Sequence, residues 1–139
     1  MPTSQRPFMG ATPYQDSAGA GATFRVWAPF AQKVFVAGEF NNWSTGASPL
    51  FSEDNGFWSV DVAGAAVGNQ YKFVIVDAAG NLLWRMDPYA SSIARSAQNL
   101  NGVIASSNEV HSTQGYSTPP WNELVIYELH LATFTQGGQ

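Results

Sequence analysis

The stretch Lys33-Val34-Phe35-Val36-Ala37-Gly38-Glu39-Phe40-Asn41-Asn42-Trp43-Ser44 joins a hydrophobic run to a polar turn that contains a tryptophan. The hydrophobic run is rich in β-branched and aromatic side chains, as a half-buried strand requires. The glycine, asparagines and serine that follow are turn residues and end the strand. The large flat indole of Trp43 therefore stands in a polar turn, where it is positioned to face a ligand.

Other short hydrophobic runs with a period of two recur along the chain, separated by turn residues. They predict strands at residues 23–28, 33–37, 57–62, 70–76, 82–86 and 103–105. We find no stretch of helical length with a 3.6-residue stripe. Six or seven short strands over roughly a hundred residues predict an all-β fold, an immunoglobulin-like β-sandwich of two antiparallel sheets.

Alternation along these strands assigns side chains to the two faces of a sheet. We expect Phe24 and Val26 to point inward. We expect Trp27 and Trp58 to pack against other side chains, because strand-forming residues flank both. Lys72 is the lone charge in an apolar strand, so its ammonium must reach water or a ligand.

Composition excludes several classes of function. The chain has 139 residues, of which 45% are hydrophobic and 12% charged, as expected for one folded domain. Its net charge of −4 and its scattered basic residues argue against a nucleic-acid partner. No run of about eighteen apolar residues occurs, so we expect no membrane span.

The chain has no cysteine, which excludes disulfides and thiolate metal sites and fits a reducing cytoplasm. We therefore expect a cytoplasmic location. His111 and His130 have no third ligand at metal spacing, so we expect no metal and no cofactor. A neutral polymer is a more natural partner than a polyanion. Sugar suits the Trp43 turn, because the C–H face of a pyranose stacks on aromatic rings and its hydroxyls bind amides.

Five segments occur in a defined order and spacing: GATFRVWAP at 21–29, VFVAGEFNNW at 34–43, GFWSVDV at 56–62, YKF at 71–73 and DPYA at 87–90. Together they resemble the family 48 carbohydrate-binding module, also called the isoamylase N-terminal domain. The resemblance implies the sandwich fold and places the module at residues 21–107. We expect residues 1–20 to be a flexible leader and residues 108–123 to be a linker, with Trp121 anchoring the domain junction.

The C-terminal segment LVIYELHLATFT at 124–135 resembles the opening of the catalytic barrel of α-amylase-superfamily enzymes. It implies that residues 124–139 are the truncated start of a (β/α)8 barrel, in an N-terminal piece of a larger protein. Within glycoside hydrolase family 13, the pattern is most similar to 1,4-α-glucan branching enzymes, which transfer α-1,4-linked chains to make α-1,6 branches in glycogen synthesis. Malto-oligosyltrehalose trehalohydrolases and debranching enzymes share the module.

The resemblance places the catalytic carboxylates on later barrel strands, so this chain by itself is not expected to be an enzyme and has no catalytic residues. The acidic residues that are present show no paired spacing, and we expect them to be solvated surface groups. They include Glu39, Glu53, Asp54, Asp61, Asp77 and Glu109.

The resemblance also implies a set of carbohydrate-binding residues. Trp43 and Trp84 would stack on glucose rings, and Lys72 and Asn101 would bind sugar hydroxyls. The implied partners are an α-1,4-glucan or maltooligosaccharide and the parent's own catalytic barrel. A second hypothesis stays open, in which the sandwich binds no sugar and serves to orient the barrel. Trp43 would then cover the end of the sandwich, Trp84 would contact the barrel, and Lys72 would face solvent.

Overall fold

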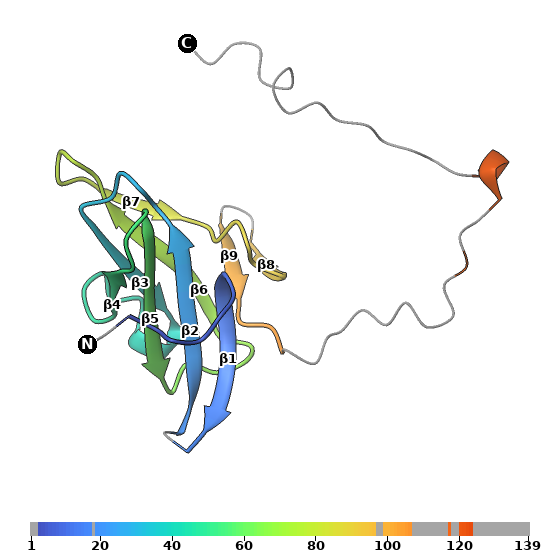
Figure 1. Ribbon diagram of the computed structural model, residues 1–139, viewed down its shortest axis with the longest axis horizontal. Helices are drawn as coiled ribbons and strands as arrows, with labels where there is room; N and C mark the ends of the chain where they lie inside the picture. Colours follow the sequence, from blue (N-terminus) through green and yellow to red (C-terminus); the bar gives the residue numbers. More distant parts are fainter. Residues whose placement is uncertain (1–2, 18, 97–98, 107–116, 118–119, 124–139) are drawn as a thin grey trace, which may run out of the picture.

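The computed structural model describes residues 3–17, 19–96, 99–106, 117 and 120–123. Within these residues the chain forms antiparallel strands and two short 3-10 helices (Figure 1). The strands are β1 (Gly10–Asp16), β2 (Gly19–Trp27), β3 (Lys33–Gly38), β4 (Pro49–Ser52), β5 (Phe57–Ala63), β6 (Gln70–Val76), β7 (Leu82–Arg85), β8 (Ser92–Arg95) and β9 (Leu100–Val103). The helices are η1 (Glu39–Asn41) and η2 (Trp121–Glu123). The all-β prediction is confirmed.

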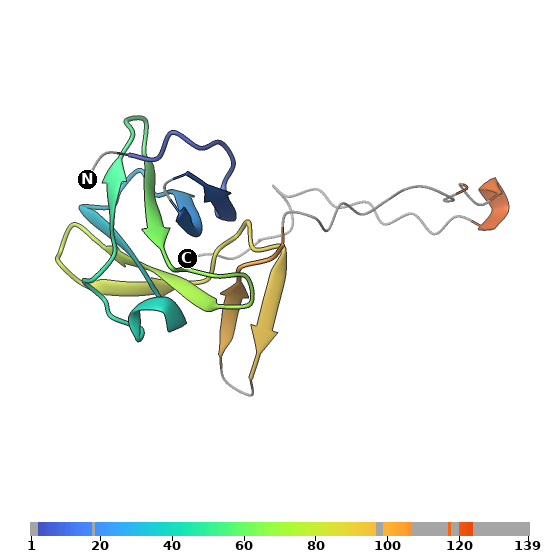
Figure 2. The ribbon, with the colours of Figure 1, turned by 90° about the horizontal axis from the view of Figure 1, so that it is seen from below.

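The strands form two layers that β4 links. The first layer runs in the order β1-β2-β5-β4, and β4 also pairs with β3. The second layer continues from β3 through β6 and β9 to β8. On the edge of β6 away from β3, β7 pairs with residues 73–76 and β9 with residues 70–71. Figure 2 shows that the β8–β9 hairpin extends beyond the sandwich.

The core lies between the two layers. Phe24 of β2, Val36 of β3 and Phe73 of β6 are completely buried, and Val26 is 5% exposed. The inward orientation predicted for Phe24 and Val26 is therefore confirmed. The Phe24 ring lies 5.1 Å from the Tyr71 ring, edge to face, a favourable geometry for aromatic pairs. Burying each of these large side chains contributes about 1.5–3 kcal/mol.

The prediction of an unstructured leader over residues 1–20 is wrong for residues 19–20, where β2 begins, and for residues 10–16. This segment forms β1 and pairs with β2 along its whole length, from Gly10 opposite Arg25 to Asp16 opposite Gly19. Ladder hydrogen bonds use the backbone, so a segment of small and polar residues forms a strand when a partner strand lies beside it. The sandwich therefore begins before Gly21.

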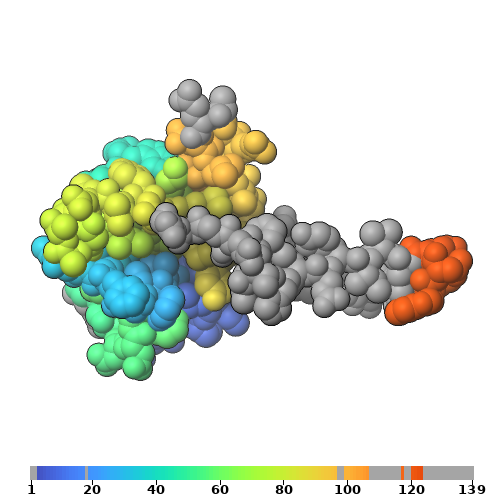
Figure 3. Space-filling view, turned by 90° about the horizontal axis from the view of Figure 1, so that it is seen from above, coloured from blue at the N-terminus to red at the C-terminus, as the bar shows by residue number. Residues whose placement is uncertain are grey.

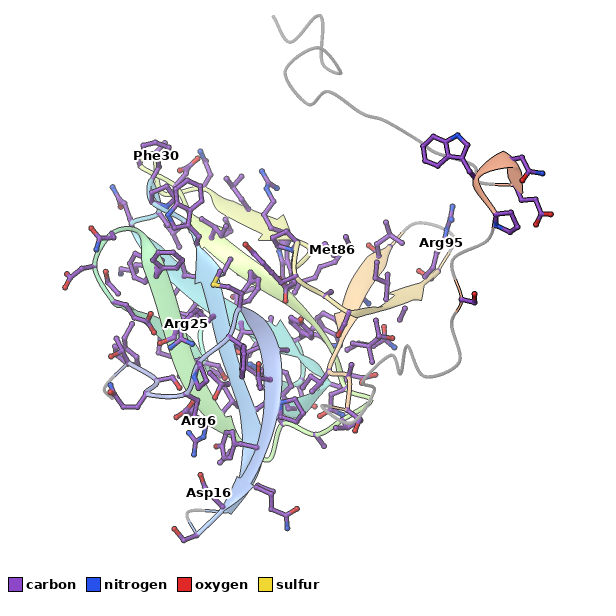
Figure 4. All side chains as sticks on the ribbon, turned by 45° about the vertical axis from the view of Figure 1, so that its right-hand side comes forward. Arg6, Asp16, Arg25, Phe30, Met86 and Arg95 are labelled. Carbon is purple, nitrogen blue, oxygen red and sulfur yellow. The ribbon has the colours of Figure 1, made fainter. Side chains whose placement is uncertain are left out.

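Arg25 fixes the segment that precedes β1 to the outer face of the first layer. Its guanidinium donates hydrogen bonds to the backbone oxygens of Ser4, Arg6 and Phe8 at 3.1, 2.5 and 2.9 Å. It also forms an ion pair with Glu53 at 2.8 Å. Figure 4 places Arg25 and Arg6 on the same side of this layer.

The acidic side chains differ from the sequence expectation at three positions. Glu39 and Asp54 are exposed as expected, whereas Glu53, Asp61 and Asp77 are half-buried. Asp61 accepts hydrogen bonds from the hydroxyls of Ser4 and Thr23, each at 2.6 Å. Burial alone would raise the pKa of Glu53, but its hydrogen bonds from Arg25 and Ser59 lower that pKa below the ordinary value. Two carboxylates of this surface are therefore structural.

Two tryptophans that we expected to pack behave differently. Trp58 is half-buried, packs against the core and donates from Nε1 to the backbone oxygen of Ala28 at 3.1 Å. Trp27 is 57% exposed, so the expectation of packing is wrong for it. Strand alternation puts Val26 inward and Trp27 outward, and the described residues leave much of the indole uncovered.

The predicted last strand at 103–105 is displaced, because β9 spans Leu100–Val103. The strands β4 and β8 were not predicted from the sequence. No helix in the described part of the chain has the length and hydropathy that a membrane crossing requires. All of the predicted barrel start and most of the predicted linker, with Glu109, His111 and His130, lie outside the described residues.

Candidate functional site

The register of the second layer brings Lys72 and Trp84 to one face. Lys72 of β6 lies opposite Ala37 of β3, and Trp84 of β7 lies opposite Val74 of β6. Lys72 and Val74 are two residues apart in one strand, so their side chains point to the same side of the sheet. Because Phe73 between them points into the core, this side is the outer face of the layer.

Asn101 reaches the same face from β9. Gly102 lies opposite Tyr71, so the register places Asn101 next to it and opposite Lys72. A Cβ at Gly102 would lie 2.9 Å from the Tyr71 ring, closer than real Cβ atoms approach. Glycine is required here because the aromatic ring of β6 fills the space under β9. Alternation puts Asn99 on the outer face with Asn101.

Trp43 comes to this face through the loop that follows β3. Asn41 fixes the loop: its Oδ1 accepts from Gly38 N at 3.0 Å, and its Nδ2 donates to Val36 O at 2.9 Å and to Ser48 Oγ at 3.0 Å. The backbone N–H of Trp43 donates to the oxygen of Gly38 at 2.8 Å. The Asn41 side chain therefore acts as the internal scaffold of this turn.

Two successive residues of this loop adopt a left-handed backbone conformation. Asn42 has φ 53° and Trp43 has φ 59°. Asparagine tolerates this region well, but a bulky residue such as tryptophan is uncommon there. Such strain persists only where surrounding bonds impose it, and it concentrates at functional sites. The loop thus holds the Trp43 indole at a small conformational cost.

These side chains together line one hollow on the surface. Trp43, Lys72, Trp84, Asn99 and Asn101 enclose a volume of about 360 Å³. The ring centroids of the two indoles lie 6.5 Å apart, and the ring planes are tilted by 41°. Trp84 is 40% exposed, and Trp43, Lys72 and Asn101 are half-buried. The structure therefore brings together all four residues that the sequence singled out.

The polar groups of the hollow are held from behind by a short chain of hydrogen bonds. Asn101 Nδ2 donates to Gln70 Oε1 at 2.8 Å, and the backbone N–H of Gln70 donates to Glu39 Oε2 at 2.8 Å. The Asn101 Oδ1 accepts no hydrogen bond among the described residues. Within the same residues, no carboxylate lies within ion-pair distance of Lys72. The hollow therefore offers a free ammonium and a free amide oxygen beside two indoles.

A buried carboxylate anchors the chain three residues after Trp84. Asp87 is 1% exposed, accepts the Tyr71 hydroxyl at 2.5 Å and accepts the backbone N–H of Tyr89 at 2.8 Å. Burial raises the pKa of Asp87 above its ordinary value, although these hydrogen bonds oppose the rise. Burial and the neighbouring Asp87 also raise the pKa of Tyr71, so the tyrosine stays a neutral donor. This pair fixes the end of β7 to the core.

Sequence reasoning missed Asn99 as a lining residue, and Glu39 and Gln70 as supports. Asn99 stands two positions before Asn101, so the period of a strand was a signal for it. Glu39 and Gln70 are 31 residues apart, and no local pattern predicts their contact. Among the described residues, no group of three histidine or acidic side chains is placed to hold a metal ion.

Several known proteins are similar to this chain. The family model for carbohydrate-binding module 48, described as the isoamylase N-terminal domain, matches residues 8–90. The 1,4-alpha-glucan branching enzyme GlgB of Chlamydia pneumoniae is 34% identical over 136 residues, covering 91% of this chain and 18% of the relative. GlgB of Chlamydia trachomatis serovar L2 is 34% identical over 151 residues, covering 99% of this chain and 20% of the relative. The chain thus spans about a fifth of the length of these relatives.

Solved structures with the same fold come from larger proteins. A pullulanase from Bacillus acidopullulyticus has a TM-score of 0.53 and 28% identity, covering 70% of this chain and 12% of that protein. The type I pullulanase of Bacillus subtilis str. 168, complexed with maltose, has a TM-score of 0.59 and 22% identity. The match covers 86% of this chain and 15% of the pullulanase. At this identity, the second likeness concerns the fold alone.

Proposed function

The chain belongs to the carbohydrate-binding module 48 family, the isoamylase N-terminal domain, and from this premise we propose that it binds α-1,4-glucan chains through its surface hollow. The family resemblance read from the sequence is confirmed. The observation that carries the proposal is the convergence of two indoles, an ammonium and amides around one hollow of about 360 Å³.

The two indoles supply the apolar part of the binding energy. Trp43 and Trp84 would each stack on the C–H face of a glucosyl unit. Their planes are tilted by 41°, so they suit a chain that curves from one unit to the next better than a flat ribbon. If stacking removes about 100–150 Å² of apolar surface from water, it contributes roughly 3 kcal/mol at about 25 cal/mol per Å².

The polar groups orient the bound sugar and contribute less binding free energy than the indoles do. The Lys72 ammonium donates hydrogen bonds, and the Asn101 amide oxygen accepts them from hydroxyls. Each good hydrogen bond contributes about 1 kcal/mol net, and the costs of association remove much of the total. The expected dissociation constant for a maltooligosaccharide is therefore about 0.01–1 mM.

The proposal for the parent protein rests on the same similarity. We propose that this chain is an accessory domain of a 1,4-α-glucan branching enzyme, with that enzyme's catalytic barrel as its covalent partner. The support is 34% identity to two branching enzymes that are about five times longer. Weak binding suits a domain that keeps an enzyme near a polymer with many equivalent sites. A cytoplasmic location remains part of this proposal.

Calorimetric titration of the chain with maltoheptaose tests the binding. We expect saturable binding in the range above, weakened at least about tenfold in Trp43→Ala, which loses about half of the stacked area. Tyr89→Ala is the matched control, because Tyr89 is an aromatic residue that is 60% exposed and lies outside the hollow. No binding up to about 10 mM would support the alternative of a structural domain without sugar affinity.

A further inference from the structure

Several strongly exposed aromatic side chains lie outside the hollow, and two of them are close together in the sequence. Trp27 is 57% exposed and Phe30 is 91% exposed. Trp27 ends β2 in the first layer, whereas the hollow lies on the outer face of the second layer. Figure 4 shows Phe30 at the tip of the loop after β2, at the outer edge of the molecule. One glucosyl unit in the hollow therefore leaves both rings free.

Two turns that are bonded to each other hold these rings. The backbone N–H of Ala28 donates to Gly56 O at 2.7 Å, and that of Ala31 donates to Ala28 O at 3.1 Å. Figure 3 shows the loop after β2, in light blue, beside the turn before β5, in green. Trp27 Nε1 donates to Asn55 O at 3.2 Å, which fixes one edge of the indole, while more than half of the residue stays exposed.

The second turn also supplies free polar side chains. Asp54 and Asn55 are exposed, and both adopt a left-handed backbone, with φ 71° and 51°. Within the described part of the chain, neither the Asp54 carboxylate nor the Asn55 amide has a hydrogen-bond partner. Carboxylate and amide groups accept and donate hydrogen bonds in the way that sugar hydroxyls require.

We propose that Trp27, Phe30, Asp54 and Asn55 form a second, weaker glucan-binding surface, here called the turn platform. The proposal rests on the proposed function, because it assigns the same class of ligand, an α-glucan. The turn platform repeats the chemistry of the hollow: two aromatic rings beside an amide and a charged group. Phe30 stands three positions after Trp27, so their Cα atoms lie at most about 10 Å apart and a short oligosaccharide reaches both.

A protein partner fits these observations less well than sugar does. A stable protein interface buries about 800 Å² on each side, and its centre is depleted of charged residues. Here one ring stands at the end of β2 and the other in the loop that follows, near an exposed acidic residue and an exposed asparagine. A sugar ring needs only one aromatic face and a few hydroxyl partners.

Two surfaces on different layers change how the chain engages a polymer. A short maltooligosaccharide occupies one surface at a time, whereas glycogen presents many chain ends to both. Occupation of the second surface then becomes an intramolecular event, and the apparent affinity for polymer rises without any new contact at the hollow. The turn platform therefore increases affinity for polymer specifically.

Nitrogen-edited NMR of the five indole N–H groups, during titration with maltoheptaose, separates the two surfaces. We expect the Trp43 and Trp84 signals to follow one binding isotherm and the Trp27 signal to follow a second isotherm with a larger dissociation constant. The response of the Trp27 signal should persist in the double variant Trp43→Ala/Trp84→Ala. Affinity electrophoresis in glycogen gives the second readout. Phe30→Ser should weaken glycogen binding by about three- to tenfold and change maltoheptaose affinity at Trp43 less than about twofold.

The outcomes distinguish this proposal from the proposed function. If the signals of Trp43 and Trp84 respond to sugar while Trp27 stays fixed up to about 50 mM, the hollow binds and the turn platform is refuted. If the Trp27 signal moves with protein concentration instead of sugar, the surface is a protein contact and the proposal is equally refuted. If no tryptophan responds, the proposed function itself fails. Phe30 is almost fully exposed, so Phe30→Ser should leave the fold unchanged, which circular dichroism checks.

Discussion

Replacing Asp87 with alanine removes the buried carboxylate that fixes the end of β7. Asp87 is 1% exposed and holds two hydrogen bonds, from the Tyr71 hydroxyl and from the Tyr89 backbone N–H. Its loss leaves the buried Tyr71 hydroxyl without a partner, at a cost of about 1–3 kcal/mol. The turn bond contributes about 0.5–1.5 kcal/mol more. Relief of the buried charge offsets part of this, so we expect Asp87→Ala to lower the unfolding free energy by about 2 kcal/mol.

Urea unfolding followed by tryptophan fluorescence measures this loss, which corresponds to a melting temperature lower by roughly 8–16 °C. A double-mutant cycle with Tyr71→Phe tests the mechanism. Both changes break one interaction, and the double variant leaves no tyrosine hydroxyl unpaired, so it should lose no more than Asp87→Ala alone. Tyr89→Ala keeps the backbone bond and should cost less than about 1 kcal/mol. A loss below about 0.5 kcal/mol for Asp87→Ala, or additive losses in the cycle, would refute the reasoning.

Three further predictions concern the same layer. Asn41→Ala removes three hydrogen bonds from the loop of Trp43. It should lower the unfolding free energy by about 2 kcal/mol and weaken maltoheptaose binding several-fold. Unchanged maltoheptaose binding in calorimetry would contradict this prediction. Gly102→Val places atoms against the Tyr71 ring and should lower the melting temperature by several degrees, whereas Val103→Ala, the neighbouring control, should not. Burial raises the pKa of Asp87, so the native state binds this proton more tightly than the unfolded chain does. The unfolding free energy, compared with that of Asp87→Asn, should therefore rise as the pH falls from 7 through the raised pKa toward about 3.9. A difference between the two proteins that stays constant with pH in urea unfolding would exclude this.

The sequence was sufficient to predict the central strands and the main features of the hollow. The alternating runs that became β2, β3, β5 and β6 are strongly apolar on one face, because they build the core. Trp43 could be assigned to a ligand surface because its turn is polar. Strand spacing and the family motif together pointed to Lys72, Trp84 and Asn101.

The remaining features depend on contacts between distant segments. β1 carries few strand-forming residues and is held by its ladder with β2, so composition indicated a flexible leader. β4 has four residues and begins with a proline, which hides it among turn residues. Trp27 was expected to pack because its neighbours in sequence are strand formers, but the described elements leave more than half of it exposed. The burial of Asp87 depends on a tyrosine sixteen residues away.

The most direct test of glucan binding at the hollow is a map of amide and indole chemical shifts during titration of the chain with maltoheptaose. We predict that the indole signals of Trp43 and Trp84 shift together with the side-chain amide signals of Asn99 and Asn101, with one dissociation constant of about 0.01–1 mM. Signals from these four residues that stay fixed at about 10 mM sugar, whatever happens elsewhere on the molecule, would contradict it.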